Sequence, residues 1–205
     1  MARPRVLITG FGPFPGTPEN PSGWLAETLA RQVPDLDCDL HARVLPTEWE
    51  VVARLAPSLY ESLQPHVMIH FGVSARAKTL RIERSAHNRT SPRADACGAL
   101  PGARAISPGG AERLHTRLPV TALSAHLRAL GYPAGASHSC GRYLCNFLYY
   151  RSLEWAEPRS RHALFVHVPP LASHGAPLAP ESLLQAAQDI VRFVLHYADK
   201  REAAA

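Results

Sequence analysis

The chain has 205 residues, of which 46% are hydrophobic, so it can bury one sizeable core and fits one domain better than two. No apolar run approaches the roughly 18 residues of a membrane span, which excludes an integral membrane helix. The formal net charge is +5, but no stretch reaches five consecutive basic residues. We therefore expect a scattered, soluble arginine-rich surface rather than a nucleic-acid-binding patch.

The start "MARPRVLITGFG" lacks the small-residue cleavage site of a signal peptide. Four cysteines in a chain of this length are too few for a disulfide framework. We expect a cytoplasmic protein whose cysteines are thiols. The oligomeric state stays open, and a homo-oligomer is compatible with the sequence.

Apolar residues alternate or repeat with helical spacing in most of the chain. Taken in chain order, the patterns predict a strand at 5–11, a helix at 22–33, a strand at 39–47, a helix at 48–64, a strand at 66–74, a helix at 120–132, a short extended segment at 135–141, a helix at 145–156, a strand at 162–171 and a helix at 180–198. Asn20 or Ser22 is expected to cap the first helix, with Pro21 near its first turn.

Residues 78–110 show no regular pattern, and the tail after residue 198 is expected to fray. Strands alternate with helices in the rest of the chain. This order predicts an α/β fold, with a mixed, largely parallel twisted sheet covered by helices on both faces as a three-layer sandwich. Ligands bind such sheets at the carboxyl ends of the strands.

The glycine-rich segment "GFGPFPG" follows the first predicted strand. It does not match the G-x-G-x-x-G loop of dinucleotide-binding proteins, and its prolines prevent it from opening directly into a helix. Phe11 and Phe14 on this stiff segment suit a flat apolar ligand, because rings stack on the faces of planar groups. Core packing of both side chains is the alternative.

The histidines and cysteines near Cys145 are compatible with two further kinds of site, of which the first is a zinc site. His138, Cys140 and Cys145 lie within eight residues, and His167 follows later, but no second C-x-x-C pair completes a zinc site. The second kind is nucleophilic catalysis. Cys145 lies at the predicted start of a helix, where unpaired N–H groups and the helix dipole favour a thiolate.

A thiolate nucleophile needs a base and a group that orients the base. His167 lies near the end of an apolar strand and could be the base, and Glu83 could hold its ring. Spacing alone leaves several such combinations open. A buried core histidine and a cysteine used only for packing remain the alternatives for these residues.

The chain resembles the pyroglutamyl-peptidase I family of cysteine peptidases. The resemblance rests on "TGFGPF", "ENPS", "HFGVS", "IERSAHN", "GRYLCN" followed by "YY", and "FVHVPPL", which occur in that order over roughly residues 5–198. Several of these forms are closer to the animal members than to the bacterial ones. The resemblance implies an α/β/α sandwich, one catalytic domain over residues 1–205, and no cofactor or metal.

The resemblance also implies an activity and its residues. It implies a cysteine omega-peptidase that removes N-terminal pyroglutamate from peptides through a thioester, with Cys145 as nucleophile, His167 as base and Glu83 as orienting carboxylate. Substrate-binding residues on the matching motifs are Phe11, Phe14, Asn20, Val73 and Arg93. The alternatives are a thiol amidohydrolase of altered specificity, a lactam-binding protein without peptidase activity, and a zinc-binding regulator.

Three positions differ from the pattern of many members. Val73 stands where many bacterial members have glutamine, and Cys140 where alanine is common, so we expect Cys140 to serve mainly in packing. The segment after Arg93, "ADACG", is one residue shorter, which leaves the exact role of Arg93 and any role of Cys97 open.

Overall fold

The structure is a computed structural model that describes residues 3–32, 36–75, 77–170 and 178–202. Leu171, at the end of the predicted strand at 162–171, and residues 203–205 of the predicted frayed tail lie outside the described residues. Within those residues, no helix has the length and apolar character needed to cross a bilayer.

The strands are β1 (Arg5–Phe11), β2 (Asp39–Leu45), β3 (Val67–Val73), β4 (Leu80–Glu83), β5 (Ser85–His87), β6 (Arg113–His115), β7 (Ala134–Ser137) and β8 (His162–Val168). The helices are α1 (Pro21–Gln32), α2 (Trp49–Leu63), α3 (Val120–Ala129), α4 (Leu144–Ala156), α5 (Pro180–Glu202) and the short 3₁₀ helix η1 (Glu157–Arg159).

Six strands form one sheet in the order β2-β1-β3-β8-β4-β7. Strands β2, β1, β3 and β8 are parallel to one another, whereas β4 runs antiparallel to β8 and parallel to β7. The predicted α/β class with a mixed, mostly parallel sheet is therefore confirmed. A separate antiparallel pair joins β5 and β6.

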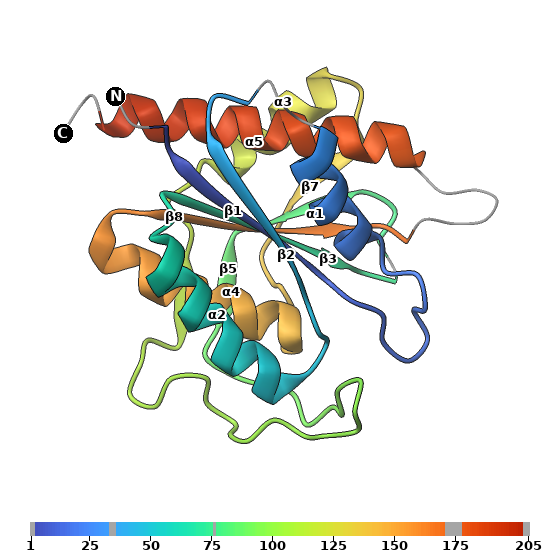
Figure 1. The fold of residues 1–205 in the computed structure, drawn as a ribbon, viewed down its shortest axis with the longest axis vertical. Coiled ribbons are helices and arrows are strands. Elements are labelled where there is room, and N and C mark those ends of the chain that lie inside the picture. Colours follow the sequence, from blue (N-terminus) through green and yellow to red (C-terminus); the bar gives the residue numbers. More distant parts are fainter. Residues whose placement is uncertain (1–2, 33–35, 76, 171–177, 203–205) are drawn as a thin grey trace.

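Helices cover both faces of the sheet, and each face has its own apolar core (Figure 1). Successive strand residues point to opposite faces, so Val6 and Ile8 pack with α1, α3 and α5, while Leu7 packs with α2 and α4. Strands β1, β3 and β8 are almost entirely buried because both of their faces are covered. The three layers predicted from the sequence are present.

The segment at 78–110 was predicted to be irregular, and the structure corrects this prediction. It contains β4 and β5, and β6 follows shortly after it. These strands have three or four residues each, too few for a recognisable period of two. The tail also differs from its prediction, because α5 continues to Glu202.

Candidate active site

A cavity of about 620 Å³ opens beside the carboxyl ends of β1, β3 and β8. It brings together eight of the residues singled out in the sequence: Phe11, Phe14, Asn20, Val73, Arg93, Cys140, Cys145 and His167. These residues come from segments spread over most of the chain, and the parallel order of the strands gathers them at one edge. Glu83 does not line the cavity and lies fully buried behind His167.

His167 lies near the end of β8 and forms a buried pair with Glu83 on the neighbouring β4. Its Nδ1 lies 2.8 Å from Glu83 Oε1, and His167 and Glu83 are 8% and 0% exposed. An ionised carboxylate can only accept a hydrogen bond, so Nδ1 carries the proton and donates it. Nε2 is then the nitrogen left for proton exchange at the cavity. The Glu83–His167 contact fixes both the tautomer and the orientation of the ring.

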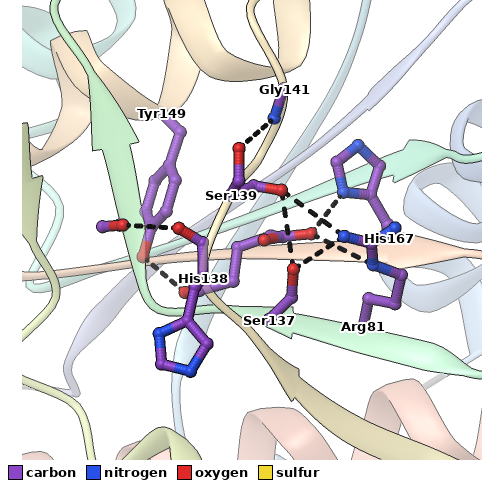
Figure 2. Close-up of polar contacts among 9 residues, drawn as sticks. Arg81, Ser137, His138, Ser139, Gly141, Tyr149 and His167 are labelled. Carbon is purple, nitrogen blue, oxygen red and sulfur yellow. Dashed lines mark hydrogen bonds and ion pairs between the residues drawn. The ribbon is translucent and has the colours of Figure 1, made fainter.

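Glu83 has a second charged neighbour that the sequence analysis missed. Arg81 Nε lies 3.7 Å from Glu83 Oε1, and its Nη2 donates to Ser137 Oγ at 2.8 Å. Both Arg81 and His167 approach the same carboxylate oxygen, and Figure 2 shows these two side chains close together. Residues two apart on a strand share a face, so the spacing of Arg81 and Glu83 in "LRIE" was the available signal. Tyr149 also holds this strand, because its hydroxyl donates to the Glu83 carbonyl at 2.9 Å.

Cys145 is the second residue of α4, in the first turn as predicted. The helix begins after Tyr143, and no side chain caps it, so the N–H groups of its first turn are not taken by a cap. Gly72 on β3 leaves room for the thiol. A Cβ added at Gly72 would lie 3.0 Å from Cys145 Sγ and 2.7 Å from Phe165 Cζ.

The electrostatics of the cavity favour a charged His167. Burial of the ring opposes its charged form, but hydrogen bonds with Cys145 and Glu83, together with their negative charges, raise the pKa of His167 to about 9. A cysteine, a histidine and a carboxylate thus lie in contact in that order. Such a chain can move a proton from the thiol to the ring and hold the resulting ion pair.

The loop between β1 and α1 is firmly held beside the thiol. Phe14 and Thr17 exchange two backbone hydrogen bonds across a turn that contains Gly16, whose φ of 84° is strained for other residues. Asn20 caps α1, because its Oδ1 accepts from Ser22 N at 3.1 Å, while its Nδ2 donates to Gly12 O at 2.9 Å. Asn20 therefore lines the cavity while its side-chain oxygen is already hydrogen-bonded to Ser22 N.

Val73 ends β3 at the cavity wall. The pairing of β1 with β3 ends at Thr9 and His70, whereas the pairing of β3 with β8 continues to Val73 and Val168. The last residues of β3 therefore have a strand partner on one side only, and their other backbone edge faces the cavity region. Backbone groups there can bind a ligand amide, whatever side chain Val73 carries.

Arg93 reaches the cavity from the loop after β5. Its guanidinium lies 4.8 Å from the centre of the Tyr143 ring, and its carbonyl accepts from Trp49 Nε1 at 3.1 Å. Cys97, four residues further on, is exposed and does not line the cavity. Its N–H donates to the Asp95 carboxylate in a local turn.

Three of the four candidate zinc ligands, Cys140, Cys145 and His167, line the cavity, but they are not arranged to hold a metal ion. Cys140 is buried in the apolar core beside α4, and Figure 2 shows the His138 ring pointing away from His167. Among the described residues, no three His, Cys, Asp or Glu side chains are grouped to hold a metal ion. Burial raises the pKa of Cys140 well above its usual value, and the nearby Cys145 and Glu83 raise it further.

Comparisons with known proteins agree on one family. Its profile, described as Pyroglutamyl peptidase, matches residues 4–183. Pyroglutamyl-peptidase 1 of Homo sapiens is 34% identical, with 98% of this chain and 96% of that protein covered. Pyrrolidone-carboxylate peptidase 1 of Ralstonia nicotianae is 36% identical, with coverages of 84% and 81%. The solved pyrrolidone carboxyl peptidase from Thermococcus litoralis superposes with a TM-score of 0.87 at 28% identity, covering 97% of this chain and 96% of that chain.

Proposed function

The chain belongs to the pyroglutamyl peptidase family, and from that premise we propose that it removes N-terminal pyroglutamate from peptides with Cys145 as the nucleophile. The observation that carries the proposal is the contact chain from the Cys145 thiol through His167 to the buried Glu83 carboxylate. In this proposal His167 is the general base and Glu83 its orienting carboxylate. The substrates are peptides that begin with a pyroglutamyl residue.

The reaction proceeds in two halves. Nε2 of His167 already holds the thiol proton before attack, and Cys145 Sγ attacks the pyroglutamyl carbonyl carbon to form a tetrahedral oxyanion. N–H groups in the first turn of α4 stabilise that oxyanion; losing one such donor costs about 10²- to 10³-fold in rate. The oxyanion collapses, the C–N bond breaks, and the proton on Nε2 passes to the leaving amine. His167 then activates water, which hydrolyses the thioester and frees pyroglutamate.

The ring of the substrate occupies the part of the cavity lined by Phe11 and Phe14. Aromatic side chains pack on the faces of a flat lactam, and backbone groups at the end of β3 pair with its amide. Asn20 keeps the Phe14 loop in place, and Arg93 lines the cavity beside the Tyr143 ring. Pyroglutamate has no free α-amino group, so a site without a carboxylate for an ammonium group suits it.

The nucleophile is tested by replacement. Cys145→Ala is expected to abolish release of amine from a pyroglutamyl-amide reporter, because no other described thiol contacts His167. Cys97→Ala is the matched control, since Cys97 is exposed and outside the cavity, and it is expected to retain activity. Persistent cleavage by Cys145→Ala would refute the assignment.

Ring specificity is tested with three reporters. The protein is expected to cleave the pyroglutamyl-amide and to leave the alanyl-amide and prolyl-amide intact, since only the lactam carries both a flat ring and a ring amide. A thiol alkylator is expected to stop the cleavage. Equal rates on the three reporters would support instead an amidohydrolase without ring specificity.

We also propose that residues 1–205 form a single catalytic domain that works in a reducing compartment such as the cytoplasm. All four cysteines are free thiols, which supports a reducing environment. One six-stranded sheet contains strands from Arg5 to Val168, which supports one domain. Every residue of the proposed machinery comes from one chain, so a homo-oligomer is compatible with activity but not required for it.

A further inference from the structure

A second cavity, of about 630 Å³, adjoins the proposed active site. Arg142 lines both cavities and precedes Cys145 by three residues, so the two cavities meet at Arg142. Its other lining residues come from the loop after β5: Arg89, Thr90, Ser91, Pro92, Leu100, Pro101, Gly102, Ala103 and Arg104. In Figure 1 this loop is the green segment that extends beyond α2 and α4.

The lining of the two cavities is strongly cationic. It includes five arginines, which are Arg81, Arg89, Arg93, Arg104 and Arg142. Among the described residues that line either cavity, none is an aspartate or a glutamate. Arg81 has Glu83 behind it as a counter-ion, but no carboxylate lies in the lining beside the other four arginines. Like charges gathered in this way are unfavourable unless a ligand neutralises them, and a hollow surface concentrates their field.

The three arginines of the second cavity have hydrogen-bonded backbone carbonyls and side chains without a protein partner among the described residues. The Arg142 carbonyl accepts from Ser91 N at 2.7 Å, and the Arg104 carbonyl accepts from Thr90 N at 2.9 Å. The Arg89 carbonyl accepts from the buried Asn146 Nδ2 at 3.1 Å. Within the described part of the chain, no hydrogen bond or ion pair engages the three guanidinium groups.

Apolar groups lie beside these charges. Leu100 is 62% exposed although it is a large hydrophobic residue, and it lines the cavity with Pro92 and Pro101. An extended peptide that carries both carboxylate and apolar side chains would match this lining, because its carboxylates would pair with the arginines and its apolar groups would pack on the apolar residues. Guanidinium groups recognise carboxylates with paired hydrogen bonds.

We propose that the second cavity binds the part of the substrate after the scissile bond and selects peptides that carry carboxylates there. The inference rests on the proposed function: with the pyroglutamyl ring between Phe11 and Phe14, the leaving chain passes Arg142 and enters the cavity. The carboxylate comes from an acidic side chain or, in short peptides, from the C-terminus. Arg89, Arg104 and Arg142 bind it.

The test compares peptides that differ only in this carboxylate. The four peptides have the sequence pyroglutamyl-Ala-X-Ala, in which X is Glu or Gln and the C-terminus is an amide or a free acid. Comparing Glu with Gln tests a side-chain carboxylate, and comparing the free acid with the amide tests the C-terminal carboxylate. At low salt, kcat/KM is expected to be about fivefold to tenfold higher for a peptide with a carboxylate than for its neutral partner. The advantage is expected to vanish in 1 M NaCl, where charges are screened within about 3 Å.

The double variant Arg89→Gln/Arg104→Gln is expected to lose most of this preference. Arg54→Gln, an exposed arginine on α2 outside both cavities, is the matched control and is expected to keep it. Thermal melting verifies that each variant is folded. If the wild type cleaves the Glu and Gln peptides equally and also the free acids and amides equally, or if the double variant keeps the preference, the inference is wrong while the proposed function stands. If the wild type cleaves no pyroglutamyl peptide at all, the proposed function itself fails.

Discussion

At the scale of single residues, the charge on His167 depends on the carboxylate behind it. Its pKa is raised to about 9 despite burial, through Cys145 and Glu83. The ring therefore stays protonated until the pH rises through about 9, and only the protonated ring can deliver a proton to the leaving amine. We expect kcat/KM to fall on the alkaline side with an apparent pKa near 9.

Glu83→Gln is expected to move this alkaline limb to lower pH, because the variant removes a negative charge that favours imidazolium. It is also expected to lower kcat by about 10²-fold or more, since a carboxamide no longer fixes one tautomer. The measurement is kcat/KM against pH for both proteins. An alkaline limb that stays at the wild-type pH would contradict this role of Glu83.

Gly72 controls the space around the thiol. In Gly72→Ala the new Cβ would lie 2.7 Å from Phe165 Cζ, and Phe165 is fully buried and has no room to move away. We expect a loss of about 1–3 kcal/mol in stability from overpacking and at least a tenfold loss in activity from displacement of Cys145. Gly135→Ala, where an added Cβ meets nothing within 4 Å, is the control. Urea unfolding and reporter cleavage check both; equal behaviour of the two variants would contradict the steric argument.

The sequence indicated the main residues of the site only through the order of several motifs. Spacing alone left Cys145, His167 and Glu83 as one combination among many, because their contact depends on which strands lie side by side. Arg81 was missed for the same reason: its partner across the sheet is His167, far away in the sequence. Burial and distance, rather than residue type, distinguish these side chains from the other arginines and histidines.

At the scale of elements, Asn146 connects α4 to the end of β5 and the loop after it through side-chain hydrogen bonds. Its side chain is fully buried, accepts from His87 N at 2.8 Å and donates to His87 O at 2.8 Å and Arg89 O at 3.1 Å. The neighbouring residue in the helix is Cys145. One amide therefore links the position of the proposed nucleophile to the wall of the second cavity.

Asn146→Ala is expected to cost about 2–3 kcal/mol in unfolding free energy, because it leaves buried backbone groups unpaired. Amide hydrogen exchange is expected to increase around His87 and Arg89. Asn88→Ala removes hydrogen bonds with Ser107 and Gly110 instead, so in this variant amide hydrogen exchange should increase near those two residues. Faster exchange in the same place for both variants would show that the loop opens as one unit and that Asn146 has no separate role.

Helices were easier to predict than short strands, for a physical reason. α2 and α3 each bury one stripe of side chains, and this stripe repeats in the sequence. β4, β5 and β6 are too short to show a repeat, and their pairing depends on distant segments. β4 nevertheless positions Glu83, so the least predictable part of the fold carries an essential part of the candidate site.

At the scale of the whole molecule, the four thiols lie in very different environments. Burial raises the pKa of Cys38 to about 11 and that of Cys140 well above its usual value. Cys97 is exposed, but a hydrogen bond with Glu48 raises the pKa of its thiol as well. Cys145 is half-buried at the cavity and contacts a histidine whose charged form is favoured. The thiolate is the reactive form, so these differences predict an order of reaction.

Iodoacetamide at neutral pH is expected to modify Cys145 first, Cys97 more slowly, and Cys38 and Cys140 only after unfolding. Peptide mass spectrometry at successive times gives the four rates, and reporter cleavage measured on the same samples gives the loss of activity. Activity should decline at the rate of Cys145 modification alone, and excess pyroglutamate should slow both by occupying the cavity. His167→Asn should slow alkylation of Cys145 while leaving Cys97 unchanged, because the favoured counter-ion of the thiolate is then absent. If activity declines at the rate of Cys97 alkylation instead, the nucleophile lies outside the cavity and the assignment of Cys145 is wrong.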